Sequence, residues 1–102
     1  MTIEEKEQYY KFFVDTWGED AQLKMCIEEM AELTQAICKY MRFKEKGCPP
    51  EVMYNLHEEI ADVANMIGQM EYIFDKRKIE EIQIEKLNRC VNKIKGSSKW
   101  RL

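Results

Sequence analysis

The sequence contains few of the residues that interrupt helices and no run long enough to cross a membrane. Its 102 residues include two prolines and four glycines. No apolar run approaches the ~20 residues of a transmembrane helix. Because glycine and proline punctuate strand-and-turn proteins, their scarcity favours long helices. We therefore expect an all-α protein without a membrane partner, folded as a single domain over residues 1–102.

Histidine is scarce, and the cysteines are not paired in sequence. The four cysteines, at positions 26, 38, 48 and 90, form no CxxC pair and have no zinc-like spacing. Reduced thiols of this kind, together with an N-terminus too acidic for a signal or transit peptide, predict a cytoplasmic protein. The only histidine is His57, whereas a ferritin-like di-iron site takes a Glu-x-x-His motif from each of two helices. A di-iron centre is therefore excluded.

The charge balance gives no sign of a nucleic-acid partner. Charged residues make up 34% of the chain and hydrophobic residues 45%, and the net charge is −3. A protein that binds nucleic acid through its phosphates usually carries a clustered basic surface, which this composition lacks. We expect a soluble globular domain that does not bind nucleic acid.

Four helices are predicted from capping signals and breaks. Thr2 and Glu5 form a capping-box pattern that opens the first helix, and Trp17-Gly18 ends it. A second helix is expected from about Glu19 to about Lys44. The later elements are a loop at 47–50, a third helix ending near residue 74, a short turn at 75–78, a fourth helix to about residue 95 and a loose tail at 96–102.

Two nearly identical acidic phrases occur thirty residues apart. They read IEEMAEL at 27–33 and HEEIADV at 57–63. Each carries two carboxylates three residues apart, Glu29 with Glu32 and Glu59 with Asp62, and this spacing puts both on one side of a helix. Packing the second helix against the third as an antiparallel hairpin would bring the four carboxylates to a common level.

The central acid of each phrase lies within an apolar stripe. At about 100° per residue, apolar side chains flank Glu29 and Glu59 on their own helical faces. Unpaired charges there would be costly, so a cation is expected between them. Oxygen ligands alone favour Mg²⁺, with Mn²⁺ as a substitute, and such an ion suits phosphate-ester or phosphoanhydride chemistry.

Fixed cations and aromatic rings are the other candidate site residues. Lys86 and Arg89 fall on one edge of the fourth predicted helix and are candidates for contacting phosphates, with a solvated basic face as the alternative. The aromatic residues available to stack on a base are Trp17, Tyr9, Tyr10 and Tyr40, for which core packing is the alternative.

Together these residues resemble the EExxE…ExxD signature of the MazG-like all-α nucleoside triphosphate pyrophosphohydrolases. The resemblance covers roughly residues 17–95 and extends to Trp17-Gly18 and Gln22 before the first phrase, to the segment 36–39 after it, and to the KLNR segment at 86–89. It implies a Mg²⁺-dependent hydrolase that cleaves the α–β phosphoanhydride of a nucleotide, releasing a monophosphate and pyrophosphate. The implied metal ligands are Glu29, Glu32, Glu59 and Asp62, and Lys86 and Arg89 would approach the phosphates.

The mechanism we expect is in-line attack of a water molecule on the α-phosphorus, with Glu32 as the general base and Glu28 as the second candidate. The resemblance also implies a homodimer or homotetramer, that is, a larger helical bundle. Apolar residues spread widely around the predicted helices agree with such an assembly. Two alternatives remain open: a catalytically silent helical oligomer that binds nucleotides or another protein, and a regulatory partner module.

Overall fold

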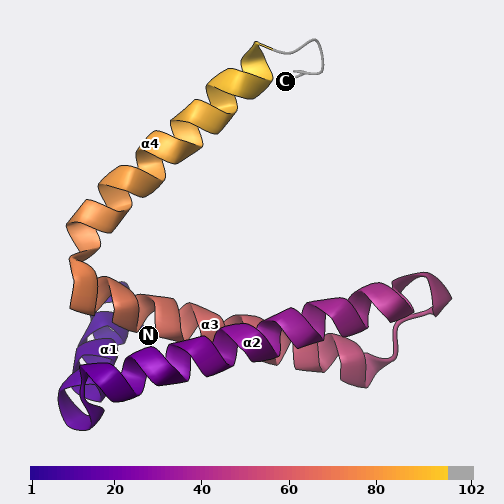
Figure 1. The fold of residues 1–102 in the computed structure, drawn as a ribbon, viewed down its shortest axis with the longest axis horizontal. Helices are drawn as coiled ribbons and strands as arrows, with labels where there is room; N and C mark the ends of the chain where they lie inside the picture. Colours follow the sequence, from indigo (N-terminus) through magenta and orange to yellow (C-terminus); the bar gives the residue numbers. More distant parts are fainter. Residues whose placement is uncertain (97–102) are drawn as a thin grey trace.

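The computed structural model describes residues 1–96, and these are helical almost throughout (Figure 1). The elements are α1 (Ile3–Trp17), α2 (Glu19–Phe43), the short 3₁₀ turn η1 (Lys44–Lys46), α3 (Pro50–Phe74) and α4 (Lys76–Lys95). No strand occurs within the described residues, so the all-α prediction is confirmed. From residue 97 onward, the predicted tail lies outside the part of the chain that the structure describes.

Local signals account for the helix ends. The Thr2 hydroxyl accepts a hydrogen bond from the Glu5 amide at 3.0 Å, and the Glu5 carboxylate accepts one from the Thr2 amide at 3.1 Å. This reciprocal pair is the predicted capping box. Gly18 separates α1 from α2 with a φ of 91°, in the region that glycine adopts without strain. Pro50 stands at the first turn of α3, where a missing amide hydrogen does no harm.

The turn between α3 and α4 is shorter than predicted. Only Asp75 lies outside a helix, with a φ of 78°, and α4 begins at Lys76. The Asp75 carboxylate accepts a hydrogen bond from the Lys78 amide at 3.3 Å and so caps the new helix. The sequence predicts a short turn at 75–78, whereas the cap makes residues 76–78 the first turn of α4.

The helices do not form one compact bundle. α2 and α3 lie side by side and run in opposite directions, and α1 packs against α3 and more sparingly against α2 (Figure 1). α4 packs against α3, contacts α1 through the ion pair of its first residue, Lys76, with Glu7, and then extends away from the other helices. The buried apolar side chains of the described residues are Val14, Cys26, Ala36, Val52 and Met66.

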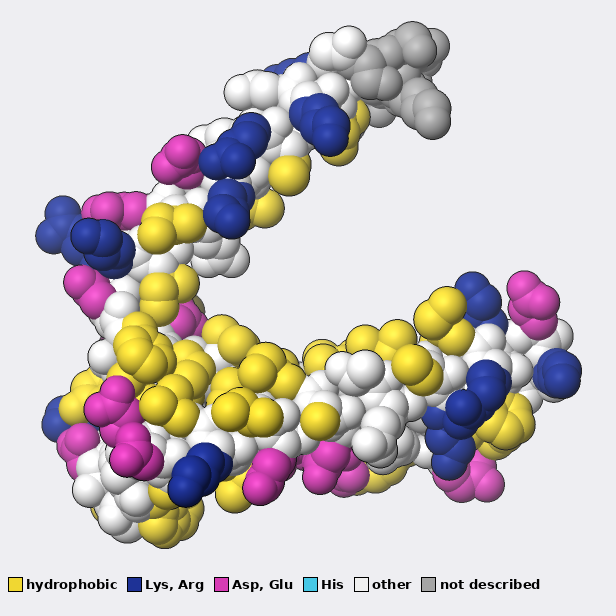
Figure 2. Space-filling model, viewed as in Figure 1, with side chains coloured by type: hydrophobic (Ala, Val, Ile, Leu, Met, Phe, Trp, Pro, Cys, Tyr) yellow, Lys and Arg dark blue, Asp and Glu magenta, His cyan; other side chains and the backbone are white. Residues whose placement is uncertain are grey.

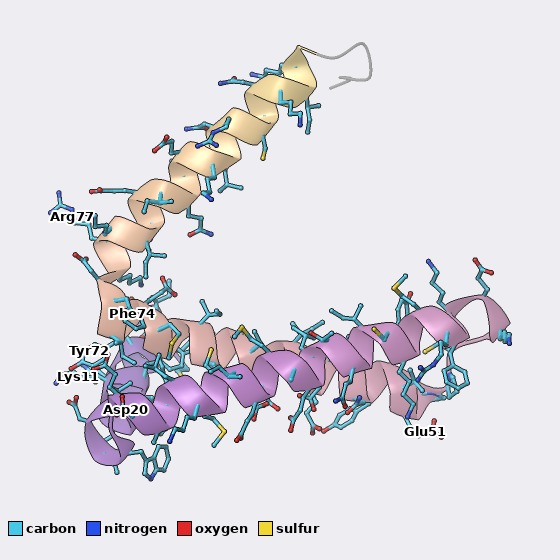
Figure 3. The ribbon with its side chains drawn as sticks, viewed as in Figure 1. Lys11, Asp20, Glu51, Tyr72, Phe74 and Arg77 are labelled. Carbon is cyan, nitrogen blue, oxygen red and sulfur yellow. The ribbon has the colours of Figure 1, made fainter. Side chains whose placement is uncertain are left out.

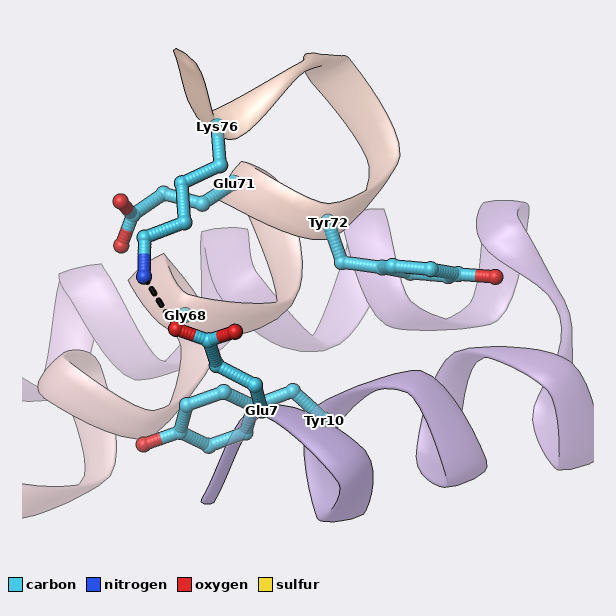
Figure 4. A pocket seen from close by; sticks show the side chains of 6 residues that line it. All are labelled: Glu7, Tyr10, Gly68, Glu71, Tyr72 and Lys76. Carbon is cyan, nitrogen blue, oxygen red and sulfur yellow. Dashed lines mark hydrogen bonds and ion pairs between the residues drawn. The ribbon is translucent and has the colours of Figure 1, made fainter. Parts of the chain in front are cut away.

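α1 is fixed to α3 by a close aromatic contact and by polar pairs at its rim. The Tyr10 ring lies directly over Gly68, and the Tyr10 hydroxyl donates a hydrogen bond to Asn65 Oδ1 at 2.9 Å. A pocket beside this contact is closed by the ion pair of Lys76 with Glu7 (Figure 4).

A second set of contacts fixes the other part of α1. The Tyr72 hydroxyl donates to Asp15 Oδ1 at 3.2 Å, and the Lys11 ammonium lies 5.6 Å from the centre of the Tyr72 ring. Figure 3 shows Lys11 and Tyr72 together at this contact. Since these pairs are exposed, we expect the Tyr10 contact to contribute most of the α1 docking energy.

The molecule is extended and has two unpartnered apolar surfaces. Its radius of gyration is 17.4 Å, whereas a compact chain of this length has a value of about 13 Å. The first surface, the α4 stripe, consists of Ile79, Ile82, Leu87, Cys90 and Ile94. The second, the open face of α2 and α3, consists of Ile27, Met30, Ile37, Met41, Ile60 and Ile67. In Figure 2, hydrophobic side chains line both arms of the hollow between α4 and the other helices.

None of the helices in residues 1–96 combines the length and the apolar character needed to span a membrane.

Candidate functional site

The two acidic phrases meet where α2 packs on α3. Glu29 of α2 and Glu59 and Asp62 of α3 each offer a carboxylate oxygen, and these three oxygens all lie within 4.8 Å of one another. No other group of three or more potential metal ligands occurs within residues 1–96. Antiparallel packing of the two helices was predicted to bring four carboxylates to a common level, and the packing of α2 on α3 brings Glu29, Glu59 and Asp62 together.

The inner oxygens of the two glutamates are buried without a partner. Glu29 Oε2 and Glu59 Oε2 are inaccessible to solvent and have no hydrogen-bond partner within the described residues. Buried polar atoms in native proteins are nearly always hydrogen-bonded or bound to an ion, because a lost partner costs about 1–3 kcal/mol, and more for a charged group. Two such atoms on facing helices indicate a place where a cation would sit.

The electrostatics of the cluster lead to the same conclusion. Burial is the main cause that raises the pKa of Glu29 and of Glu59 above the usual range of glutamate. For both groups, the next causes are the negative charges of Glu32 and Asp62. Glu32 is exposed, but its charge acts on both central acids. All four carboxylates therefore form one cluster whose mutual repulsion a divalent cation would relieve.

The residues present fit a hard divalent cation. The donors are carboxylate oxygens from two rigid helices, which is the ligand type that Mg²⁺ and Mn²⁺ prefer. His57 is exposed and lies outside the cluster, so no nitrogen donor joins the set. Glu28, the second candidate base, is exposed on α2 next to Glu29 and is not one of the three grouped ligands.

A polar groove adjoins the cluster on the side of the loop between α2 and α3. Its volume is about 350 Å³, and its lining residues are Glu32, Gln35, Ala36, Lys39, Asn55 and Glu59. It therefore shares two acids with the cluster and contains one cation, Lys39. Lys39 is not among the phosphate-contacting residues predicted from the sequence. The available signal was its position seven residues after Glu32, which puts the two side chains two turns apart on one side of the helix.

An aromatic groove lies on the other side of the cluster, where α1 joins the pair. Its volume is about 510 Å³, and its lining residues are Phe13, Trp17, Ala21, Gln22, Met25, Met66 and Gln69. The rings of Phe13 and Trp17 stack with their centroids 5.5 Å apart. Gln22 Nε2 donates a hydrogen bond to Gln69 Oε1 at 2.6 Å, and both side chains are buried.

Lys86 and Arg89 do not reach the carboxylate cluster of their own chain. Both are exposed on α4, which packs against α3 and contacts α1 only at its first residue, Lys76. Arg89 forms a surface ion pair with Glu85 at 3.6 Å, and Lys86 stands within the α4 stripe. Of the aromatic candidates, Trp17 lines the aromatic groove, whereas Tyr10 packs on Gly68 and Tyr9 stacks on Phe13.

Comparison of the chain with models of protein families, with curated proteins and with solved structures finds no match.

Proposed function

We propose that the protein is a Mg²⁺-dependent nucleoside triphosphate pyrophosphohydrolase of the MazG-like kind, cleaving the α–β phosphoanhydride to release a monophosphate and pyrophosphate. The observation that carries the proposal is the pair of buried, unpartnered oxygens Glu29 Oε2 and Glu59 Oε2, which belong to one cluster of four carboxylates. A helical protein gains no stability from such a cluster without a cation. The paired acidic phrases supply the link to nucleotide hydrolysis.

In this proposal Glu29, Glu59 and Asp62 would hold the cation, and Glu32 lies at the exposed edge of the carboxylate cluster. A bound Mg²⁺ ion would neutralise the cluster, offset charge on phosphate oxygens and make a water more acidic. Glu32 is exposed beside both central acids, so it can accept the proton of the attacking water, with Glu28 as the second candidate. Lys39 can donate to oxygens of the leaving pyrophosphate, because it shares a groove with Glu32 and Glu59.

The test is a product assay on a panel of nucleoside di- and triphosphates, run with Mg²⁺ and with EDTA, that resolves phosphate from pyrophosphate. The expected result is monophosphate plus pyrophosphate from at least one triphosphate, only when Mg²⁺ is present. A folded protein that produces neither product from any nucleotide would refute the proposal and favour a silent binding module.

Lys39 gives a prediction that separates the two sets of candidate phosphate ligands. Since a charge-assisted hydrogen bond contributes about 1.5–3 kcal/mol, Lys39→Met should lower kcat/KM by about tenfold or more. Lys24→Met is the matched control, because Lys24 is an exposed lysine of the same helix outside both grooves. Wild-type kinetics in Lys39→Met would remove Lys39 from the site. A large loss in Lys86→Met would then assign the phosphates to α4 of another copy.

We also propose that the protein works as a homodimer or homotetramer in which the α4 stripe is covered by a second copy. Ile82 is 48% exposed and Leu87 is 58% exposed in the single chain. The 20-residue helix α4 leaves its apolar side unpacked, although most helical stability in proteins comes from packing such a face, and exposed apolar patches of this kind mark interfaces. The open face of α2 and α3 offers a second apolar surface across the same hollow, which favours another copy of this chain as the occupant.

The assembly can be tested by placing charge in the α4 stripe. Ile82→Glu combined with Leu87→Glu should convert the oligomer to monomer, because burying the two carboxylates in an apolar interface would cost several kcal/mol. Light scattering after size exclusion measures the mass. Glu81→Gln lies on the opposite side of α4 and should leave the mass unchanged. A wild-type protein that is monomeric at micromolar concentration would contradict the proposal.

A further inference from the structure

We propose that the aromatic groove binds the nucleobase of the substrate, with Trp17 stacking on the base and Gln22 hydrogen-bonding to its edge. The inference rests on the proposed function, to which it adds the site that selects among nucleotides. Four observations carry it: the position of the groove relative to the carboxylates, its aromatic wall, its buried amide pair and the polar groove on the other side of the cluster.

The groove lies two helical turns from the carboxylates on both helices. Gln22 precedes Glu29 by seven residues, and Gln69 follows Asp62 by seven. Because α2 and α3 run in opposite directions, both steps lead toward the same end of the pair. At 1.5 Å per residue, the separation along the helices is about 10 Å, a distance that one nucleotide can bridge.

The groove and the cluster also open on the same side of α2 and α3. On α2, Met25 of the groove and Glu32 of the cluster both lie within roughly 60° of Glu29, in the same rotational sense. On α3, Asp62 and Gln69 deviate from Glu59 in one shared sense. A ligand whose phosphates lie at the carboxylates can therefore extend its base into the groove without crossing a helix.

The wall of the groove suits a flat ring. Trp17 remains 60% exposed although it stacks on Phe13, with an angle of 21° between the ring planes. Met25 and Met66 also line the groove and supply flexible apolar contacts. Bases stack on exposed aromatic side chains because every base presents a π-face. A tryptophan used only for core packing would be more deeply covered.

The amide pair gives the groove a means of reading the base. Gln22 Nε2 donates to Gln69 Oε1, and Gln69 Nε2 donates to the Asn65 carbonyl oxygen at 3.4 Å. These bonds fix the orientation of both amides and use both polar atoms of Gln69. The Gln22 carbonyl oxygen remains as an acceptor for the amino group or the ring N–H of a base. Sites built to hydrogen-bond a substrate discriminate strongly against analogues that leave a buried group unpaired.

The polar groove indicates how the nucleotide would be oriented along the two helices. It lies on the other side of the cluster from the aromatic groove and contains Lys39. The base would therefore point toward α1 and the pyrophosphate toward η1, with the scissile bond at the carboxylates between them.

The test uses nucleosides, which lack phosphates and so report on the aromatic groove alone. In a Trp100→Phe background, Trp17 is the only tryptophan and its fluorescence reports binding. We expect at least one of adenosine, guanosine, cytidine and uridine to quench Trp17. Gln22→Met, which keeps the shape and removes the acceptor, should weaken the preferred nucleoside at least tenfold. Gln8→Met, an exposed glutamine of α1, is the control and should bind like the parent protein.

A second measurement distinguishes failure of the base-binding proposal from failure of the hydrolase proposal. In the hydrolysis assay, Gln22→Met and Trp17→Leu should each reduce the ratio of kcat/KM between the best and the worst base at least fivefold, with Mg²⁺ affinity unchanged. Trp17 is exposed, so its replacement should leave the fold intact even if Gln22→Met unfolds.

The assignment of the groove would be overturned if both variants hydrolyse nucleotides with unchanged base preference and no nucleoside quenches Trp17. The hydrolase proposal would still stand in that case. Nucleoside binding that Gln22→Met weakens, in a protein that hydrolyses no nucleotide, would support the groove and refute the hydrolase.

Discussion

Glu59→Gln is expected to abolish hydrolysis while making the metal-free protein more stable. The substitution removes one of the three grouped ligands, so turnover should fall by about two orders of magnitude or more. In metal-free protein it also removes a charge that burial and the charges of Glu32 and Asp62 disfavour, and the melting temperature should rise. Turnover comes from the pyrophosphate assay, and stability from thermal unfolding in EDTA.

A neighbouring residue provides the matched control. Glu58→Gln makes the same chemical change one position earlier, at an exposed side chain outside the grouped ligands. It should retain activity and respond to Mg²⁺ like the wild type, whereas Glu59→Gln should lose most of the rise in melting temperature that Mg²⁺ produces. Full activity of Glu59→Gln at ordinary Mg²⁺ concentrations would refute the proposed function. A lower melting temperature in EDTA would show that the carboxylate makes a stabilising contact instead.

The carboxylate cluster could be predicted from the sequence because its acids stand at positions that cost stability and can be recognised from helical periodicity. The i, i+3 spacing and the apolar surroundings of Glu29 and Glu59 are properties of single helices, which follow from 3.6 residues per turn. Placing the two phrases at one level needed only the assumption that α2 and α3 pack in opposite directions. A charge in an apolar stripe conflicts with local rules, and such conflicts are expected at functional sites.

The two grooves were not predictable in the same way. The aromatic groove takes Phe13 and Trp17 from α1, and their position depends on how α1 docks on α3. Nothing in the helical pattern indicates that docking, because it depends on the single glycine at position 68. The role expected of Lys86 and Arg89 depended on the direction of α4, which the positive φ of Asp75 sets. The placement of a helix is difficult to predict from the sequence when it depends on one backbone angle or on one residue without a side chain.

Gly68→Ala should therefore be the most damaging conservative change outside the carboxylates. A Cβ atom at this position would overlap the Tyr10 ring and would lie 2.7 Å from its Cζ atom. α1 would have to move, at a cost of about 2 kcal/mol, typical of overpacking and larger than the gain in helix propensity. Thermal unfolding should show a melting temperature roughly 10 °C lower.

Gly96→Ala is the control for this change, because Gly96 has an ordinary φ of −75° and its added Cβ would come no closer than 3.5 Å to a neighbour. It should alter stability by less than about 0.5 kcal/mol. Adding Tyr10→Ala to Gly68→Ala should cost less than the sum of the two single changes, because the clash is then absent. If the effects of Tyr10→Ala and Gly68→Ala simply add, the two residues are not in contact. Because α1 carries Trp17, Gly68→Ala should also weaken nucleoside binding to the aromatic groove while Glu29, Glu59 and Asp62 still bind Mg²⁺.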